Sequence, residues 1–417
     1  MTALAGFPLN FQDSVVPLTL PSVYTTEGQL LFSSGSSSNV APNTPMDVQR
    51  FQDDLAALTP GNQVQLFSGI SFDPHFRNGY IATDILGMDQ EIGSVKFSAS
   101  YVGTVGIHLA SVLSPNSYGG ADPAFAPYTQ FNSTGQAIGG FGPELVMTTG
   151  SHSSYHALQT SVSQNTVRMG LSFQASYTFS KSMDDTSAVP GGITANGGVI
   201  LQTLPQDPYR PQADRGPSTF DVTHVFTLNL IQSLALDRLR FLQPLGKKLT
   251  KGWQLLDITT LTTGPPFTVY SGVQQTGAGA GGTDRPDLLA KPNFSTNGTV
   301  REDYFGLGAA NSSWFQIPIN IPGGSGPNHG RFGTLGRGTF RAPGFRDFDL
   351  ALIKDTAFGH RGNGELAILQ IRAEFFNIFN EVNFGLPSNI VRGSGFGVIS
   401  KTAGPSRQIQ FSLKLNY

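Results

Sequence analysis

The sequence has no cysteine, few charged residues and no long apolar run. Among its 417 residues there is no Cys, which excludes a disulfide framework, a thiolate nucleophile and a Cys-ligated metal. Charged residues make up only 13% and the net charge is −2, which argues against a nucleic-acid-binding protein. No window of about 18 apolar residues occurs, so no transmembrane helix is predicted.

Glycine, proline and small polar residues take the place of what is missing. The chain has 50 Gly and 27 Pro, and hydrophobic residues reach only 39%. This composition favours many strands joined by turns and long polar loops over a packed helical bundle. The N-terminus MTALAGFPLNFQDSVVPLTLP lacks a basic region, and Asp13 interrupts its apolar residues, so no signal peptide is predicted.

Alternation of apolar and polar residues recurs along the chain. The clearest case is GLSFQASYTFS at 170–180, where every second residue from Leu171 to Phe179 is apolar. Successive side chains of a strand point to opposite sides, so such a segment has one apolar and one polar face. In GWQLLDITTLTTG the alternation is imperfect, which indicates a bulge or a switch of face. The pattern predicts about nine strands, at 80–91, 93–104, 153–165, 170–182, 221–235, 252–271, 345–358, 365–380 and 407–417.

Short and long connections alternate between these predicted strands. The connections at 91–93, 165–170 and 358–365 are short, and the basic one at 236–251 is intermediate. Long loops are predicted near 105–152, 183–220, 272–344 and 381–406. An antiparallel up-and-down order follows. Segregation of long loops at one end favours a transmembrane β-barrel, with short periplasmic turns and long extracellular loops, over a soluble β-sandwich. For any single strand, the half-buried sheet of a soluble protein is the alternative.

A series of motifs runs in order from about residue 70 to the C-terminus. An early hairpin, FDPHFRNGYIATDILGMDQEIGSVKFSASYVGTVGIHL, is followed by SYHALQTSVSQ, GLSFQASYTFSKSMDD, PYRPQADRGPSTFDVTHVF, GWQLLDITTLTTGPPFTV, DRPDLL, GRFGTLGRGTFRAPGFRDFDLAL, LQIRAEFFNIFNEVNFGLPS and RQIQFSLKLNY. Together they resemble the Oar-like TonB-dependent outer-membrane receptors that are abundant in Acidobacteria. The resemblance implies a barrel in the outer membrane of a Gram-negative-type cell that imports a scarce nutrient with energy delivered by TonB. It implies a transporter without a cofactor, and no enzyme.

Other parts of that family are not detected in this sequence. Family members carry a signal peptide, a carboxypeptidase-regulatory-like domain and a plug with a TonB box, and their barrel has about twenty-two strands. Residues 70–417 are therefore expected to form the C-terminal part of a larger barrel, with about 9–10 strands. Residues 1–69 are expected to be loop-rich, with one further strand at QVQLFSG. The hypothesis is a receptor fragment that does not transport alone and meets TonB only through a missing plug.

One predicted strand carries charges on its polar face. In LQIRAEF, Gln370, Arg372 and Glu374 alternate with apolar residues. A charge facing lipid costs about 2–4 kcal/mol at mid-bilayer, so these three side chains are predicted to face the lumen. An ion pair or hydrogen-bond network that stabilises the wall is favoured. A role in the permeation path or in plug docking is the alternative.

The last strand, RQIQFSLKLNY, resembles the C-terminal signal that the barrel-assembly machinery recognises. Gln410, Leu415 and the terminal Tyr417 fit that signal, while Ser412 replaces its usual glycine. The apolar residues of this strand are expected to face outer-membrane lipid.

Two motifs have the spacing of a ligand site. GAGAGG, at 277–282, fits the glycine spacing of a dinucleotide-binding loop, but no helical pattern follows it, so a flexible loop is favoured. SHSSYH contains His152 and His156, but it lacks a nucleophile elbow and reads as a strand end. Neither a catalytic residue nor a metal site is predicted from them.

Acidic and aromatic residues supply two further candidates. Asp184 and Asp185, in SMDDTS, could bind calcium through oxygen ligands, although solvated loop carboxylates are favoured. Tyr101, Tyr177 and Phe179 fit an aromatic girdle at a membrane interface, with core packing as the alternative.

The expected function is capture of an unidentified extracellular ligand. The loops near 105–152, 183–220 and 272–344 are expected to contact it, because binding residues concentrate on loops. The alternatives are a non-transporting surface barrel or adhesion protein, and a soluble β-sandwich binding module.

Overall fold

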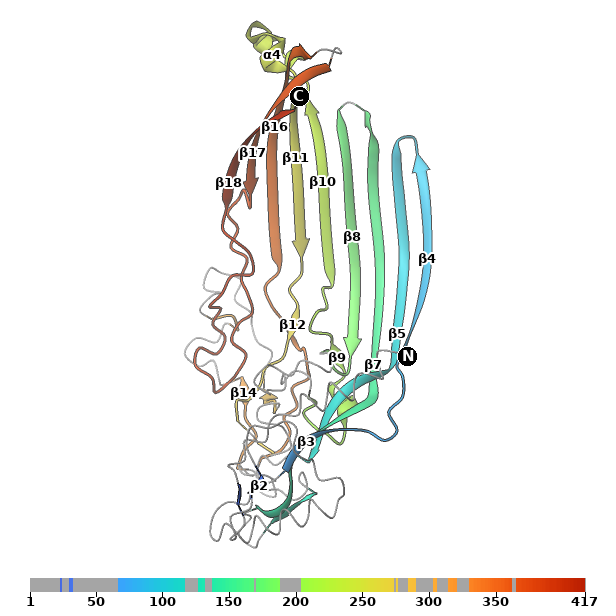
Figure 1. Cartoon of the computed structure of the whole chain (residues 1–417), viewed down its shortest axis with the longest axis vertical. Coiled ribbons are helices and arrows are strands. Elements are labelled where there is room, and N and C mark those ends of the chain that lie inside the picture. Colours follow the sequence, from blue (N-terminus) through green and yellow to red (C-terminus); the bar gives the residue numbers. More distant parts are fainter. Residues whose placement is uncertain are drawn as a thin grey trace.

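Nine strands of the described chain form one antiparallel wall (Figure 1). The computed structural model describes residues 23–24, 30–32, 67–116, 127–131, 137–168, 170–187, 204–273, 275–276, 284–289, 303–305, 314–320, 330–361 and 365–416. The strands of the wall are β4 (Tyr80–Ile92), β5 (Val95–Asn116), β7 (Ala137–Arg168), β8 (Leu171–Asp184), β10 (His224–Leu234), β11 (Trp253–Thr262), β16 (Phe345–Arg361), β17 (Glu365–Phe376) and β18 (Gln408–Asn416). They are hydrogen-bonded in sequence order, so the predicted up-and-down order is confirmed.

The connections segregate as predicted (Figure 1). At one end, called the turn end here, only two residues separate β4 from β5 and β7 from β8, and three separate β16 from β17. Gly93 and Gly170 have positive φ there, which lets a tight turn form without a Cβ clash. The basic link from β10 to β11 contains the short helix α4 (Lys247–Thr250) at the same end. The longer connections meet at the opposite end, called the loop end.

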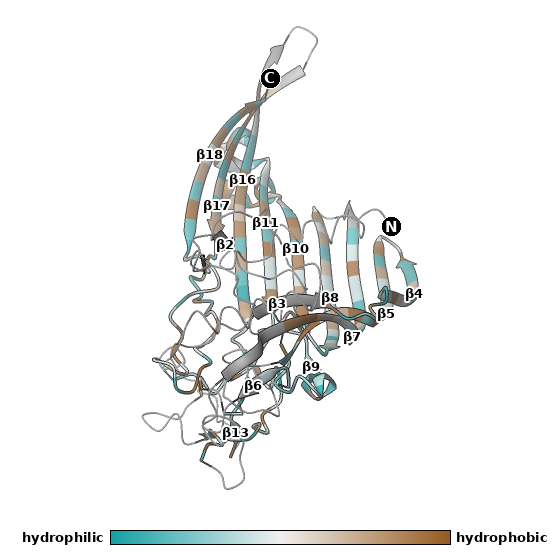
Figure 2. Cartoon of the chain, turned by 60° about the horizontal axis from the view of Figure 1, so that its bottom comes forward, coloured by the Kyte–Doolittle hydropathy of each residue, from teal (hydrophilic) through white to brown (hydrophobic). Residues whose placement is uncertain are grey.

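The wall is open along both of its long edges (Figure 2). In the described part of the chain no ladder joins β4 to β18. Every residue of β4 is exposed, as is nearly every residue of β18. This arrangement agrees with the prediction of a partial barrel rather than a closed small one.

The predicted long loop at 105–152 is wrong in its bounds. β5 continues to Asn116 and β7 begins at Ala137, so most of this region is strand. Their register shifts between Gly106 and Leu109, where His108 has φ 55°, and this shift breaks the alternation on which the prediction rested. Two short strands, β3 (Phe67–Phe72) and β6 (Thr129–Phe131), also pair with β7. The β3 ladder is parallel, an exception to the all-antiparallel prediction.

The strand predicted at 252–271 is shorter and straighter than expected. β11 ends at Thr262, ahead of Pro265 and Pro266, and its register is unbroken against both neighbours. The predicted bulge is therefore wrong. In the N-terminal segment, where one strand was expected, β1 (Val23–Tyr24) pairs with β2 (Leu30–Phe32), and β3 starts at Phe67.

The apolar core lies at the loop end rather than in the wall. β12 (Pro266–Phe267) pairs with β15 (Phe340–Arg341), and β13 (Asp287–Leu288) pairs with β14 (Phe315–Gln316). Aromatic rings from these strands pack around Phe305, which is fully buried. The buried cluster comprises Phe267, Val269, Tyr304, Phe305, Phe315, Leu335, Phe340, Ala342, Val391, Phe396 and Ile399. Helices are few and short in the described residues, and none has the length and apolar character needed to span a bilayer.

Candidate functional site

Cross-strand pairing sorts the side chains of the wall into two faces. Directly paired residues of adjacent strands point to the same side of a sheet. Phe173 pairs with Leu230, and Ala175 pairs with Leu228, so their side chains share a face. Figure 2 shows the alternation as brown and teal bands along the strands. The apolar face carries, from β4 to β18, residues such as Leu86, Tyr101, Leu158, Ala175, Leu228, Leu255, Leu350, Ala373 and Phe411.

The opposite, polar face is the one that the loops cover. Near the loop end of β8, Ser180, Ser182 and Asp184 on the polar face are buried, whereas Tyr177 and Phe179 on the apolar face are exposed. The Ser180 hydroxyl donates to the Val222 carbonyl at 3.0 Å. The loop-end residues therefore fold against the polar face and leave the apolar face free.

The apolar face is bounded by Trp253 at the turn end and by several aromatic residues at the loop end. At the turn end Trp253 pairs with Lys354, and the Trp253 indole donates to the Leu249 carbonyl at 2.7 Å. Ten positions further along the strand direction, Thr263 bonds to His224. At a rise of about 3.3 Å per residue, ten positions span about 33 Å along the strand. At the strand tilt usual in membrane barrels, this length corresponds to a height of about 25 Å across the membrane. That height matches the apolar band of an outer-membrane barrel.

Two similar tyrosine–histidine pairs mark the loop-end boundary of this face. The Tyr101 hydroxyl lies 2.7 Å from His156 Nδ1, and the Tyr177 hydroxyl lies 2.8 Å from His224 Nδ1. In both pairs the ring centroids are 6.1 Å apart. Each polar tip is satisfied while the rings stay on the surface, as suits an interface between an apolar and a polar medium.

Asp257 places a charge in the middle of the apolar face. Asp257 pairs with Leu230 and with Leu350, so it lies among apolar side chains, and its carboxylate accepts a hydrogen bond from the Thr259 hydroxyl at 3.1 Å. Its neighbour Ile258 lies on the polar face, beside Asn229. The imperfect alternation in this strand is thus a true exchange of polarity between two adjacent positions.

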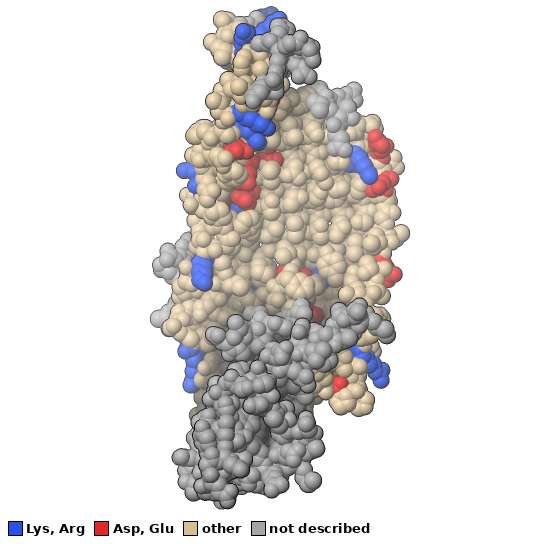
Figure 3. Space-filling view, in the orientation of Figure 1, with Lys and Arg blue, Asp and Glu red and all other residues tan. Residues whose placement is uncertain are grey.

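The three candidate lumen residues lie together on the polar face. Arg372 and Glu374 form an ion pair at 3.2 Å. The Gln370 amide donates to Asp355 of β16 at 2.9 Å. These contacts match the stabilising network that the sequence favoured, and orientation toward a lumen stays a prediction. Figure 3 shows one side of the wall. In the middle of the part of this side that no grey atoms cover, few side chains are charged.

The residues of the C-terminal motif divide between the two faces. Gln410 pairs with Glu374 and Ser412 pairs with Arg372, so both lie on the polar face. Leu415 pairs with Leu369 on the apolar face. Tyr417 lies outside the described residues, so its predicted part in the assembly signal stays a prediction.

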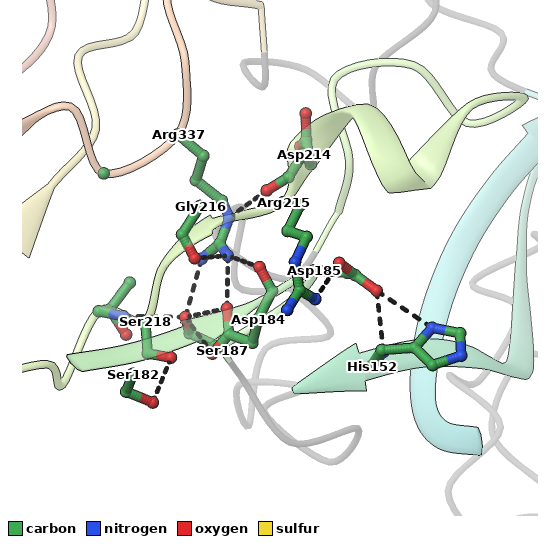
Figure 4. Close-up of polar contacts among 12 residues, drawn as sticks. His152, Ser182, Asp184, Asp185, Ser187, Asp214, Arg215, Gly216, Ser218 and Arg337 are labelled. Carbon is green, nitrogen blue, oxygen red and sulfur yellow. Dashed lines mark hydrogen bonds and ion pairs between the residues drawn. The ribbon is translucent and has the colours of Figure 1, made fainter. Parts of the chain in front are cut away.

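A buried ion pair anchors the loop end to β8 (Figure 4). The Arg337 guanidinium binds the Asp184 carboxylate, and both side chains are almost fully buried. Arg337 also donates to the Asp214 carbonyl at 2.7 Å and to the Ser187 hydroxyl at 2.8 Å. The Arg337 side chain therefore joins the end of β8 and the residues just after it to the loop at Asp214, which lies 123 positions from Arg337.

Further Asp–Arg pairs extend this network. Asp214 binds Arg285 at 2.6 Å, again with both side chains buried. The remaining pairs join Asp185 to Arg215, Asp221 to Arg341, and Asp287 to Arg331. Their residues come from the ADRG, STFD, DRPD, GRFG and GRGTFR segments of the motifs described above. Apart from Asp185, which was considered as a calcium ligand, none of these residues had a predicted role, although the repeated Asp and Arg in the loop motifs was a usable signal.

Burial shifts the proton affinity of two loop-end groups. Burial raises the pKa of the Asp284 carboxyl above its usual value, although backbone N–H groups of Thr276 and Gln275 oppose the shift. Burial also raises the pKa of the Tyr304 hydroxyl to about 12. Both groups serve as hydrogen-bonding partners inside the loop-end assembly.

The calcium hypothesis for Asp184 and Asp185 is not supported. Asp184 is bound by Arg337, and Asp185 lies 3.4 Å from Arg215 and 3.5 Å from His152. The described residues contain no group of three or more His, Asp or Glu side chains that could hold a metal. His156 is hydrogen-bonded to Tyr101, while the glycine motif at 277–282 lies outside the described part of the chain.

Comparison with known proteins decides the family. Residues 9–410 match the outer membrane beta barrel domain. The chain belongs to this family. Its location is therefore the outer membrane, and in such a wall the apolar face is expected to turn toward lipid.

The solved structures that match the chain include an outer membrane transporter. The outer membrane transporter YddB from Escherichia coli is similar with a TM-score of 0.40 and 12% sequence identity. The match covers 85% of this chain and 34% of the transporter, so the chain spans about a third of that protein's length. No curated protein matches the sequence.

Proposed function

We propose that the chain forms part of the wall and the extracellular mouth of a TonB-dependent, Oar-like transporter for a scarce solute. The observation that carries the proposal is the packing of the loop end against the polar face through buried Asp–Arg pairs. A fixed assembly of loops over the interior side of a wall can hold ligand-binding side chains in place at the pore mouth. A barrel that serves only as an anchor does not need one.

The proposed partners follow from the two faces and the two edges. Outer-membrane lipid covers the apolar face, and the barrel-assembly machinery reads the last strand. Unpaired backbone groups in lipid cost several kcal/mol each, so the exposed edges of β4 and β18 require further strands to complete the wall. TonB acts only through a plug held inside the completed barrel. If this part of the proposal holds, the described wall cannot transport a solute alone.

The experiment compares solute uptake by cells with and without the gene. Culture media are profiled for solutes that the wild type removes and the deletion strain leaves behind. A second culture of the wild type is treated with a protonmotive-force uncoupler, and a third is depleted of TonB. The proposal expects the same solute to remain in all three perturbed cultures. A chromosomal Arg210→Ala variant, which removes an exposed arginine and its pair with Asp207, should take up the solute normally.

A different result would support the surface-barrel alternative. In that case the protein fractionates with the outer membrane and shows heat-modifiable migration, yet its deletion leaves no solute unused. TonB depletion then has no effect beyond that seen in the deletion strain. Failure to fractionate with the outer membrane would contradict the family assignment itself.

A further inference from the structure

A group of basic side chains lies on the apolar side of the wall at the loop end. The group, called the cationic rim here, consists of His152, His156, Lys181 and Arg215. His156 and Lys181 are direct cross-strand partners on β7 and β8. The short strand β9 (Gly216–Pro217) pairs with the end of β8, which brings Arg215 next to Asp185.

The rim points away from the loop-covered side. Along the end of β8, Lys181 is exposed, whereas Ser180 and Ser182 on either side of it are buried. The side chains of His152 and Arg215 are 47% and 43% exposed. Since alternate residues of one strand face opposite sides, the exposed residues of the rim continue the apolar face beyond its last aromatic row.

The rim has an excess of positive charge. Asp185 is the carboxylate that faces it, and this group is shared between Arg215 at 3.4 Å and His152 at 3.5 Å. Arg215 also donates to the Ser154 hydroxyl at 2.9 Å. No described carboxylate forms an ion pair with Lys181. Asp84, on the same face, lies two strands away from His156.

The depth of the rim matches the head groups of the outer leaflet. His156 is the partner of Tyr101, and Lys181 is two residues beyond Phe179, so the rim begins where the Tyr–His row ends. Aromatic girdles of this kind lie at the boundary between hydrocarbon and head groups. Side chains just outside the girdle meet phosphate groups rather than acyl chains, and Lys and Arg bind phosphate by charge-assisted hydrogen bonds.

We propose that the cationic rim binds the phosphate groups of a phosphorylated glycolipid in the outer leaflet. Lys181 supplies an unshared ammonium group, Arg215 supplies a guanidinium partly held by Asp185 and Ser154, and the two histidines supply ring N–H donors. The site rests on the family's place in the outer membrane and not on transport, so it stands whether or not the chain belongs to a TonB-dependent importer.

The test measures lipid retention by the full chain extracted from outer membranes in mild detergent. The protein is titrated with bisphosphorylated lipid A, with dephosphorylated lipid A and with inorganic phosphate, and bound species are counted by native mass spectrometry. The proposal expects bisphosphorylated lipid A to bind at least about fivefold more tightly than the dephosphorylated form. Inorganic phosphate at the same concentration should not displace it.

Matched variants locate the site. Lys181→Gln and the double variant Lys181→Gln/Arg215→Gln should weaken lipid A binding stepwise, with the double variant at least about fivefold weaker than the wild type. Lys414→Gln removes the same charge from the polar face and should bind normally. Because Arg215 also holds Ser154 and Asp185, heat-modifiable migration checks the fold of the double variant. Lys181→Gln, which breaks no ion pair, tests the proposal independently.

Three results would overturn the proposal. Equal binding of the phosphorylated and dephosphorylated lipids would show that phosphate is not recognised. Displacement by inorganic phosphate at the concentration of the lipid would indicate a simple anion site. Loss of binding in Lys414→Gln equal to that in Lys181→Gln would show that overall charge, rather than the rim, attracts the lipid.

Discussion

The wall and the loop end of this protein are held together in different ways. In the wall, each strand bonds to its neighbours in sequence, and the alternation of side chains decides which face is apolar. At the loop end, the deciding contacts join residues that are far apart, as with Arg337 and Asp184, 153 positions away. The buried apolar cluster of the described residues also lies there. The wall is therefore specified by local pattern, and the loop end by a few distant pairs.

This difference predicts that the two regions fail separately. A variant that breaks a buried loop-end contact should loosen the loops while the strands stay paired. A variant that places a charge on the apolar face should prevent insertion of the wall without touching the loop-end contacts. Four comparisons test this, from the largest expected effect to the smallest.

Arg337→Met should have the largest effect on the loop end. It leaves the Asp184 carboxylate buried without its partner, which costs about 3–5 kcal/mol. Limited proteolysis of the extracted protein should show rapid cleavage in the loops, whereas heat-modifiable migration of the wall is retained. Arg210→Met, which removes the exposed arginine of the Asp207–Arg210 pair, should cost about 1 kcal/mol. If Arg337→Met both speeds cleavage of the loops and abolishes heat-modifiable migration, the two regions are not independent.

Phe305→Ala should destabilise the same assembly through its core. Removing a fully buried ring costs about 3–5 kcal/mol, because the cavity cannot close completely. The same proteolysis assay measures the effect, with Phe241→Ala as the control, since that ring is 75% exposed at the turn end. If the control were as sensitive as Phe305→Ala, the buried cluster would not be what holds the loops.

Ala175→Lys and Ser176→Lys compare the two faces at adjacent positions of β8. A lysine at Ala175 on the apolar face should cost about 2–4 kcal/mol near mid-bilayer. A lysine at Ser176 faces the other side and should be tolerated. Urea-induced unfolding from lipid vesicles measures both. Equal costs at the two positions would contradict the assignment of faces.

The Arg372–Glu374 ion pair should have the smallest effect. Both side chains are partly exposed, so Arg372→Glu should cost about 1 kcal/mol. The exchange Arg372→Glu/Glu374→Arg should recover most of that loss if the pair only stabilises the wall. Unchanged stability of Arg372→Glu together with altered solute uptake would favour the alternative role in permeation or plug docking.

The sequence predicted the wall well because its pattern is local. The strands near 170–182 and 365–380 were located from alternation alone, since burial on one face repeats every second residue. The prediction failed at 105–152, because register shifts near His108 hide the same alternation. It also left open whether the imperfect alternation at Asp257 and Ile258 marks a bulge or a switch of face, because alternation cannot distinguish an irregular backbone from an unusual residue.

The candidate site was predicted less completely. Gln370, Arg372 and Glu374 could be assigned to one face because they share a strand. The partner of Asp184 could not be predicted, because loop closure over more than a hundred residues decides which arginine reaches its carboxylate. Its carboxylate therefore resembled a candidate calcium ligand, while its actual role is to hold Arg337.

The assignment of the apolar face to lipid is tested most directly by site-directed spin labelling along β8. The chain has no cysteine, so single Cys substitutions from Leu171 to Phe179 each give one labelling site. In outer-membrane vesicles, the account predicts that odd-numbered positions are accessible to oxygen dissolved in lipid and even-numbered positions to a water-soluble nickel chelate. Loss of this two-residue alternation, or the opposite phase, would contradict it.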